Sequence, residues 1–290
     1  MERLLRKILK YQIILYLALL PIVSYAWDGS AHKVIAAIAY SQLTPAARQS
    51  IDQLTQIVDP GYPPTARFLY IAPLADRWRK TGENNGKISH FTNQPWSPDG
   101  TPTTPGPSPN LVAMIGQNIS IYTSSNASAH EKAIALVYLV HLMADAHQPL
   151  HCSNRFTKEF PQGDRAGTLF WIHAPQAHTL HNYWDKAANL LAVGKWHYPL
   201  SNKHISRLAA GLEIQYPSAV FGSEVNNDNI EQWAQQCNAL AQQVVYQIVP
   251  NRKPNAAYKK LVSETAARQF TLAGYRIAAF LNKVAANQEK

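Results

Sequence analysis

Apolar residues recur at a helical period along most of the chain, so almost all of the elements that this pattern predicts are helices. The segment 44–58 is typical, because Thr44 is a suitable N-cap and Pro45 would take the first helical position. Helices are predicted over residues 31–43, 44–58, 65–80, 111–124, 129–147, 178–193, 229–249 and 260–286. Few segments alternate at the strand period, and the sequence therefore predicts an all-α fold.

The stretch from 95 to 110 interrupts this pattern. It contains six prolines, which do not continue a helix, and it is predicted to be a long loop. Such a segment could link two domains, but the candidate site residues lie on both sides of it. A surface excursion from one domain fits better, and residues 27–290 are therefore predicted to form a single domain.

The first 26 residues have the three parts of a secretory signal peptide. A basic start, MERLLRKILK, precedes the apolar run IILYLALLPIV and the small-residue box SYA, so the mature chain would begin at Trp27. A membrane anchor is the alternative, but the apolar run has only about half of the roughly 20 residues that a helical span needs. We therefore expect cleavage, a secreted or periplasmic protein, and no stable membrane association afterwards.

Composition and charge set further limits. The 290 residues are 46% hydrophobic and 16% charged, which is ample for a sizeable core. The net charge is +9, and removal of residues 1–26 takes away four basic residues and one acidic residue, which leaves +6. This mild excess of positive charge permits a polyanionic substrate without requiring one.

The two cysteines, Cys152 and Cys237, would meet an oxidising environment after export, so a disulfide is favoured over two separate buried thiols.

One predicted helix carries side chains that suit a metal ion better than a buried core. The stretch Leu139–His151, LVHLMADAHQPLH, holds three histidines and one aspartate in an otherwise apolar pattern. His141 and Asp145 are four residues apart, so they project from one face of a helix and can reach one metal ion. Pro149 disfavours helix at the preceding residue, and His151 should therefore lie just beyond the helix end.

A second pair repeats this spacing. In HNYWD, His181 and Asp185 are also four residues apart, and an imidazole with a carboxylate is a good ligand pair for zinc. One such pair alone usually indicates a solvated helix face or a hydrogen-bonded core histidine. Two pairs, in a chain that also has His32 and an ADRWR segment followed by His90, favour a metal site.

In this order, the motifs resemble the single-strand-specific, trinuclear-zinc nucleases, the family of the fungal S-one and P-one enzymes, which is related to zinc-dependent phospholipase C. The family pattern begins with Trp at the mature N-terminus and His five residues on, and it continues with Ala-Asp-x-x-Arg and with His before an aromatic residue. It ends with His-x-x-x-Asp-x-x-Gln-Pro-Leu-His and Leu-His-x-x-Trp-Asp. The matching residues are Trp27, His32, Asp76, Arg79, His90, Phe91, His141, Asp145, His151, His181 and Asp185. The resemblance implies a mainly helical domain of the zinc phospholipase C and single-strand nuclease type.

The resemblance also implies three zinc ions per chain. The first would be held by Asp76, His90, His141 and Asp145. The second would be held by the α-amine and carbonyl of Trp27, by His32 and by Asp145. The third would be held by His151, His181 and Asp185. Asp145 would serve two ions, because its two oxygens can bridge a metal pair about 3.5–4 Å apart.

Other matched positions imply contacts with substrate. Arg79 would neutralise charge that develops on a phosphate, and Phe91 would stack on an unpaired base. Thr168 stands where the family has the asparagine of its base pocket, and Asn93 stands where a carboxylate would orient the arginine. Asp28 replaces a glycine of the N-terminal motif, a change interpreted as affecting backbone freedom and not the ligands.

Residues outside this ligand set receive simpler interpretations. His147 has no metal role in the family pattern and is interpreted as a hydrogen-bonding residue at the helix end. Cys152, which adjoins a ligand, has none either and is predicted to pair with Cys237. The tryptophans interpreted as core residues are Trp171, Trp184 and Trp233. The basic segment NRKPN at 251–255 is interpreted as a solvated turn.

Together these features predict a monomeric, exported, zinc-dependent phosphoesterase. Its expected substrates are single-stranded RNA and DNA, cleaved endonucleolytically to 5′-phosphate products, and 3′-nucleotides, which would lose their phosphate. Two alternatives remain open. One is a zinc-dependent phospholipase C that acts on phospholipid head groups, and the other is an exported zinc-binding protein without turnover.

Overall fold

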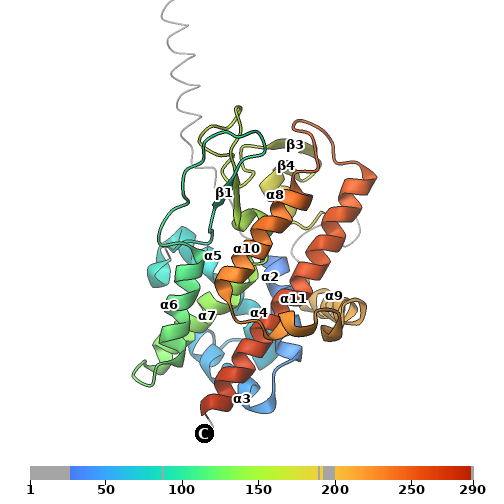
Figure 1. Ribbon diagram of the computed structural model, residues 1–290. Helices are drawn as coiled ribbons and strands as arrows, with labels where there is room; N and C mark the ends of the chain where they lie inside the picture. The colour runs from blue at the N-terminus through green and yellow to red at the C-terminus, as the bar shows by residue number, and fades with distance from the viewer. Residues whose placement is uncertain (1–26, 87, 189, 192–199, 289–290) are drawn as a thin grey trace, which may run out of the picture.

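The computed structural model describes residues 27–86, 88–188, 190–191 and 200–288, and it confirms the predicted fold, a single mainly helical domain (Figure 1). The α-helices are α2 (Gly29–Ser41), α3 (Pro45–Val58), α4 (Pro64–Ile71), α5 (Leu74–Thr81), α6 (Leu111–Thr123), α7 (Ala129–Asp145), α8 (Leu180–Asp185), α9 (Asn202–Gln215), α10 (Ile230–Leu240) and α11 (Ala256–Gln288). The short strands are β1 (Gln94–Trp96), β2 (Ser153–Arg155), β3 (Trp171–Ala174) and β4 (Ala177–Thr179). Two single-turn segments also bear on the site, η2 (Pro149–His151) and the π-helical η5 (Ala241–Val245). The predicted signal peptide, residues 1–26, lies outside the described residues.

Helix α7 is the central element. Its residues from Leu136 to Asp145 are all buried, and it packs against α3, α6 and α11. A capping box starts it: the Ser128 hydroxyl accepts from the Glu131 N–H, and the Glu131 carboxylate accepts from the Ser128 N–H. A helix that is apolar on every side must be covered on every side, and the surrounding helices supply that cover.

The long helix α11 brings α2 close to this centre (Figure 1). The approach depends on Gly274, because a Cβ there would lie 2.6 Å from Ile38 Cγ2. Only glycine leaves room for so close a contact. The contact seats α2, and with it His32, beside the buried part of α7.

Two predicted helices differ from those observed. The segment 65–80 forms two helices, because Pro73 has no N–H and its ring would clash with the preceding turn; the second helix starts after it. The segment 178–193 begins in β4 and becomes helical only after Thr179, whose hydroxyl caps α8. That helix ends at Asp185, and Ala187 and Ala188 have left-handed backbones with φ of 48° and 52°.

The structure also contains elements that the hydrophobic pattern did not indicate. Helix α9 buries only Ile205, Ala209 and Leu212, a stripe too narrow to stand out in the sequence. The strands β1 and β2 pair in parallel, and β3 and β4 form an antiparallel hairpin. The predicted proline-rich loop is present and largely exposed between β1 and α6. In the part of the chain that the structure describes, no helix combines the length and apolar character needed to cross a bilayer.

A second, smaller core lies beneath the β3–β4 hairpin. It contains Phe170, Ile172, Leu180 and Trp184 from the hairpin and α8, packed against residues of η5 and α11. The Trp184 indole N–H donates to the Tyr258 hydroxyl over 3.0 Å. The predicted disulfide is also present nearby: Cys152, just after η2, is bonded to Cys237 of α10. Together these contacts fix the η2 and α8 segments against the C-terminal half of the chain.

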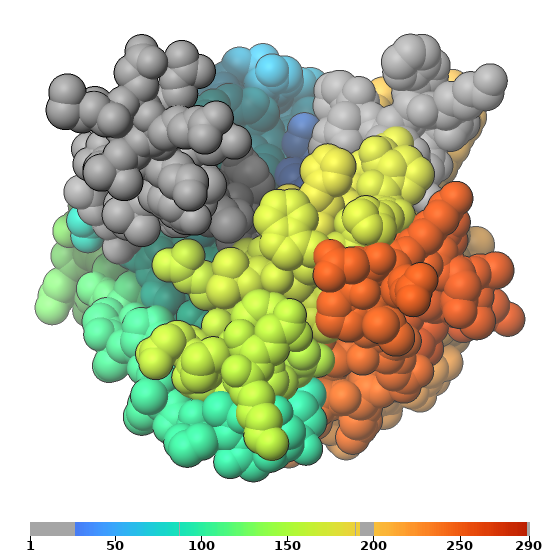
Figure 2. Space-filling view, turned by 90° about the horizontal axis from the view of Figure 1, so that it is seen from above, coloured from blue at the N-terminus to red at the C-terminus, as the bar shows by residue number. Residues whose placement is uncertain are grey.

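The core interpretation of the three tryptophans is correct for two of them. Trp184 and Trp233 are buried, but Trp171 is 51% exposed, so its assignment to the core is wrong. In β3, Ile172 and Ala174 point inward, and the alternation of a strand therefore turns Trp171 outward. Viewed from the end that carries this hairpin, the chain around β3 and β4 (yellow) lies beside the segment that leads into α11 (orange) (Figure 2).

Candidate metal centre

Five histidines and three aspartates meet in the interior, between α2, α5, α7, η2 and α8. They form three groups in which the possible ligand atoms lie within 4.8 Å of one another. The groups are His32 with His141 and Asp145, Asp76 with His90 and His141, and His151 with His181 and Asp185. The structure thus brings together all the side chains that the sequence proposed as ligands, apart from Trp27, whose proposed contribution is main-chain.

Asp145 occupies the middle of this cluster and is fully buried. Its Oδ1 lies 3.2 Å from His32 Nε2, and its Oδ2 lies 3.0 Å from His90 Nδ1 and 3.2 Å from His141 Nε2. The two oxygens of one carboxylate therefore face different imidazoles. Such a carboxylate can serve two cations at once.

Backbone carbonyl groups orient three of the imidazoles. The Nδ1 atoms of His141, His151 and His181 lie 2.8, 2.9 and 2.7 Å from the carbonyl oxygens of Ala72, His90 and Ala166, respectively. Donation from Nδ1–H to these oxygens leaves the Nε2 lone pair directed into the cluster. This arrangement is the usual way in which proteins fix the tautomer and direction of a metal-binding histidine.

The cluster also contains buried polar atoms without a hydrogen-bond partner among the described residues. They include Asp76 Oδ1, His151 Nε2 and Asp185 Oδ2, and also His32 Nε2 and Asp145 Oδ1, which lie 3.2 Å apart without forming a hydrogen bond. Buried polar atoms are normally paired, because an unpaired one loses its hydration without replacement. A bound cation would give these nitrogen and oxygen atoms the partner that they lack, and the set of imidazoles and carboxylates matches the ligand preference of zinc.

The pKa shifts within the cluster also favour a bound cation. Burial, reinforced by the nearby carboxylates of Asp76 and Asp145, raises the pKa of Asp185 well above its usual range. Burial lowers the pKa of His90 and holds that of His151 well below its usual range. The Asp145 carboxylate behaves differently, because the His141 and His151 imidazoles beside it hold its pKa well below its usual range, and it in turn raises the pKa of His141 to about 8. A bound cation would favour the deprotonated form of every one of these ligands, including the Asp185 carboxyl that burial keeps from ionising.

The start of the predicted mature chain is packed into this region. Trp27 is fully buried, with its ring edge-on to Phe270 at a centroid distance of 4.7 Å. Asp28 caps α2 by accepting from the Ser30 and Ala31 N–H groups, and its own N–H donates to the Asp185 carbonyl. Burial raises the Asp28 pKa to about 6. Asp28 therefore does more than alter backbone freedom, because it starts the helix that carries a proposed ligand.

The three proposed substrate residues differ in their exposure and in the residues that they contact. Arg79 lies beside Asp76, with its Nη2 3.9 Å from Asp76 Oδ1, and 21% of its side chain is exposed. The Phe91 ring lies 4.3 Å from the His151 ring, centre to centre. Thr168 is buried, and its hydroxyl donates to the Arg165 carbonyl, so that hydroxyl proton is already engaged within a turn.

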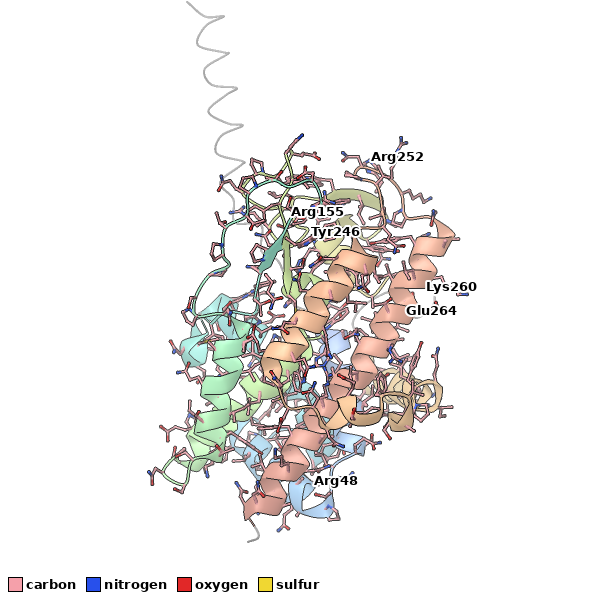
Figure 3. The ribbon with its side chains drawn as sticks, in the orientation of Figure 1. Arg48, Arg155, Tyr246, Arg252, Lys260 and Glu264 are labelled. Carbon is pink, nitrogen blue, oxygen red and sulfur yellow. A yellow bond between two sulfur atoms is a disulfide. The ribbon has the colours of Figure 1, made fainter. Side chains whose placement is uncertain are left out.

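A buried network holds the turn that contains Thr168. The Asp164 carboxylate accepts from the Tyr246 hydroxyl over 2.7 Å and from the Gly167 N–H over 3.0 Å. The Arg155 guanidinium lies over the Tyr246 ring at 4.7 Å, at the same end of the molecule (Figure 3). Gly167 has φ of +77° and accepts through its carbonyl from the His181 N–H. The network therefore holds the Gly167 carbonyl in place, and this carbonyl fixes the backbone of the proposed ligand His181.

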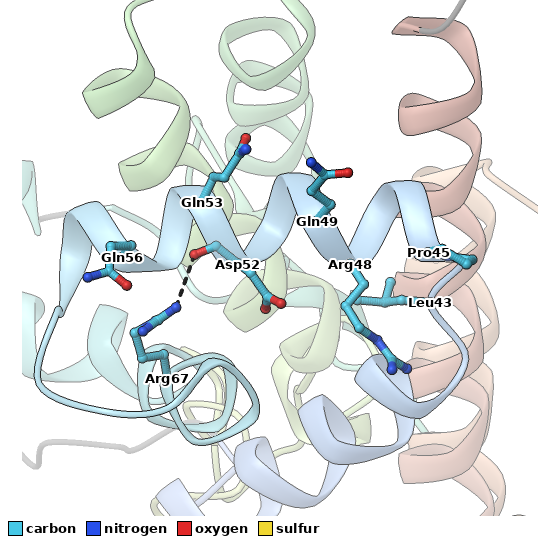
Figure 4. A pocket seen from close by; sticks show the side chains of 8 residues that line it. All are labelled: Leu43, Pro45, Arg48, Gln49, Asp52, Gln53, Gln56 and Arg67. Atoms are coloured by element: carbon cyan, nitrogen blue, oxygen red, sulfur yellow. Dashed lines mark hydrogen bonds between the residues drawn. The ribbon is translucent and has the colours of Figure 1, made fainter.

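Two clefts elsewhere on the described surface lack this combination of clustered imidazoles and carboxylates. One of about 670 Å³ over α3 is lined by Leu43, Pro45, Arg48, Gln49, Asp52, Gln53, Gln56 and Arg67 (Figure 4). Its Arg67 donates to the Asp52 carbonyl over 3.3 Å, a contact that joins α4 to α3. A cleft of about 800 Å³ contains Arg276, which donates to His147 Nε2. Burial and the Arg276 charge lower the His147 pKa to about 3, and this agrees with the interpretation of His147 as a hydrogen-bonding residue.

Gln148 is a site residue to which the sequence interpretation gave no role. It lies in the QPL stretch between two proposed ligands, which was the available signal. Its amide donates to Asp185 Oδ1 over 2.6 Å, and its side-chain oxygen accepts from the Leu150 N–H. One side chain thus caps η2 and orients a carboxylate of the third group.

Replacement of Gln148 by Leu should lower the affinity of the third group for a metal ion roughly 10- to 100-fold, because Asp185 loses the donor that orients it. Competition with a chelator would measure the affinity. Gln49→Leu, at an exposed position on α3, is the matched control and should leave the affinity unchanged. Equal affinities of the Gln148→Leu variant and the unchanged protein would rule out this orienting role.

Comparison with known proteins covers nearly the whole chain. Residues 27–286 match the protein family described as S1/P1 Nuclease. The chain is also similar to Nuclease PA3 from a Penicillium species, with 24% identity over 281 residues, which is 89% of this chain and 97% of that protein. The family match includes every residue of the candidate metal centre.

Proposed function

The chain belongs to the S1/P1 nuclease family, and from that premise we propose that it is a zinc-dependent endonuclease that cleaves single-stranded RNA and DNA to 5′-phosphate products. We include removal of the phosphate from 3′-nucleotides in this proposal. Family membership already implies a hydrolase that acts on nucleic acid. The observation that best supports the finer proposal is the convergence of three ligand groups around Asp145.

We assign three zinc ions to the three ligand groups, two of which share His141. His90 and His141 both face Asp145 Oδ2, which supports placing them with Asp76 around the first ion. His32 faces the other oxygen, Oδ1, and would share the second ion with the main-chain atoms of Trp27. His151, His181 and Asp185 would hold the third ion. Bound zinc would polarise the phosphate and lower the pKa of an attacking water.

The chain's own residues would bind and orient the substrate around these ions. Arg79 is partly exposed beside Asp76, so it can contact a phosphate oxygen and neutralise charge that develops there. Phe91 lies against His151 and can offer a ring face to a base next to the third group. A base that is already paired in a duplex cannot stack in this way, which would restrict cleavage to unpaired strands.

We also propose that the enzyme is exported and acts as a monomer. The predicted signal peptide and the Cys152–Cys237 disulfide support export, because disulfides form and persist in oxidising compartments. All of the proposed ligands come from one chain, so the site does not require a second subunit.

A side-by-side assay tests the proposal against its nearest rival. The zinc-loaded enzyme is given denatured DNA, duplex DNA, a 3′-nucleotide and phosphatidylcholine vesicles. We expect rapid cleavage of denatured DNA, slow cleavage of the duplex and release of phosphate from the 3′-nucleotide. Release of phosphocholine without cleavage of nucleic acid would instead identify a phospholipase C.

Phe91→Ala should weaken binding of single-stranded oligonucleotides by about 1–3 kcal/mol, the effect of losing one base stack, with unchanged zinc content. Measured KM values and zinc per chain would check both parts. Phe91→Trp keeps a ring face and should retain most of the affinity. Equal cleavage of duplex and single strands by the unchanged enzyme would argue against any selection by stacking.

A further inference from the structure

The outer face of the β3–β4 hairpin carries three ring side chains. In β3, Trp171 and His173 point outward while Ile172 and Ala174 point into the second core. In β4, His178 also points outward. Trp171 is 51% exposed; the pairing of the two strands shifts register between Trp171 and Ala174, so Trp171 can point outward although Thr179, its buried cross-strand partner, caps α8. We call Trp171, His173 and His178 the ring face.

The segment that leads into α11 extends this hairpin with positive charge. The Asn251 N–H donates to the Trp171 carbonyl over 2.8 Å, and the His173 N–H donates to the Arg252 carbonyl over 3.0 Å. The turn predicted at 251–255 therefore lies along the edge of β3, where Arg252 and Lys253 are exposed. Figure 3 shows Arg252 at the hairpin end of the molecule.

The two chain segments that meet at the hairpin have only positively charged side chains among their Asp, Glu, Lys and Arg positions. The chain has no Asp or Glu from Arg165 to Trp184 or from Gln232 to Ser263. The same two segments contain Arg165, Arg252, Lys253, Lys259 and Lys260, of which Lys260 is paired with Glu264 over 3.7 Å. A surface that joins exposed rings to the cations of Arg252 and Lys253 suits a polyanion that also has stackable bases.

The ring face is directly connected to the candidate metal centre. Gly167 accepts through its carbonyl from the His181 N–H, and Phe170 accepts from the Leu180 N–H. Trp171 follows four residues after Gly167, so its backbone lies within about 14 Å of that turn even if the chain is fully extended. A strand held at the metal centre can therefore reach the ring face within a few nucleotides.

We propose that the ring face, with Arg252 and Lys253, binds nucleotides that flank the cleaved bond of a single strand, and that Trp171 stacks on one of their bases. This inference rests on the proposed function. Rings on an exposed sheet beside basic residues are the arrangement by which proteins bind single strands without reading sequence. A membrane-docking face would need a broader apolar surface, and here Val249 is the other exposed large apolar side chain in the two segments.

The first test changes the stacking ring. In the zinc-loaded enzyme, Trp171→Ala should raise the Kd for a phosphorothioate oligo-dT, measured by fluorescence anisotropy, about five- to tenfold. The KM for a long single-stranded DNA should rise in parallel, while kcat and KM for 3′-AMP stay unchanged, because a mononucleotide does not reach the ring face. Trp171→Phe should restore most of the binding, and Tyr62→Ala, which removes another exposed ring, should have no effect.

The second test changes the charge. Arg252→Ala should weaken oligo-dT binding and reduce the slope of log Kd against log salt by about 0.7, as expected when one phosphate contact to a single strand is lost. Arg207→Ala, at an exposed position on α9, is the matched control. An unchanged salt slope in Arg252→Ala would overturn the assignment of Arg252.

The outcomes separate this inference from the proposed function. If the unchanged enzyme cleaves single-stranded DNA and Trp171→Ala binds it equally well, the inference is wrong and the proposed function stands. If the unchanged enzyme neither binds nor cleaves nucleic acid, both are wrong. Equal losses on 3′-AMP and long DNA would show damage to the metal centre, and a loss confined to phosphatidylcholine vesicles would show a membrane-docking face; either result would overturn the inference.

Discussion

Asp145→Asn is expected to lower the zinc content from three ions per chain to about one and to reduce kcat by on the order of 1,000-fold, which corresponds to several kcal/mol of lost transition-state stabilisation. The reason is geometric. One carboxylate faces His32 with one oxygen and His90 and His141 with the other. Asparagine offers a single oxygen, and its NH₂ group would face imidazole nitrogens on the other side.

Two matched variants sharpen this test. Asp185→Asn affects only the third group, so it should lose one zinc ion and cost less activity than Asp145→Asn. Asp52→Asn, whose carboxylate accepts from the Tyr40 hydroxyl away from the cluster, should retain all three ions. Elemental analysis with single-turnover rates would measure both quantities. A fully active preparation of the unchanged enzyme with one zinc ion per chain would rule out the three-ion proposal.

One extra residue before Trp27 is expected to leave the protein folded but without one zinc ion and without most of its activity. In the precursor this nitrogen is part of an amide, whose lone pair is delocalised into the carbonyl and makes a poor ligand. A free α-amine, with a pKa of about 7.7–8.0, loses its proton readily beside a dication. Signal-peptide cleavage would then be the activating step and would keep the enzyme silent until export.

Trp27, the first residue of the predicted mature chain, lies in the interior next to the candidate metal centre. Trp27 is buried against Phe270, and the neighbouring Asp28 N–H donates to the Asp185 carbonyl. The test compares a chain that begins Met-Trp27 with one that begins at Trp27. Trp27→Phe with the authentic start keeps the amine and should retain three ions despite looser packing. Full zinc content and full activity in the extended chain would show that the terminal amine is not a ligand.

The sequence by itself predicted the helical fold and two ligand pairs for a local physical reason, and the resemblance to a known family supplied the remaining candidate ligands. A helix places residues four apart on one face, so the pairs His141–Asp145 and His181–Asp185 are visible in a few neighbouring letters. The same periodicity indicated most of the helices. It did not reveal the β3–β4 hairpin, because a four-residue strand is too short for alternation to be recognised, and Trp171 was therefore assigned to the core.

Only the tertiary structure decided how these local elements meet. That Asp145 turns one oxygen toward His32 and the other toward His90 depends on where α2 and the segment before β1 pack, and that packing requires Gly274 opposite Ile38. Such contacts join residues far apart in the chain, and no spacing rule encodes them. Local helix propensity allows many arrangements of these helices. Long-range packing selects one of them, because the burial of closely fitting apolar surfaces stabilises the fold whatever the sequence separation of the residues involved.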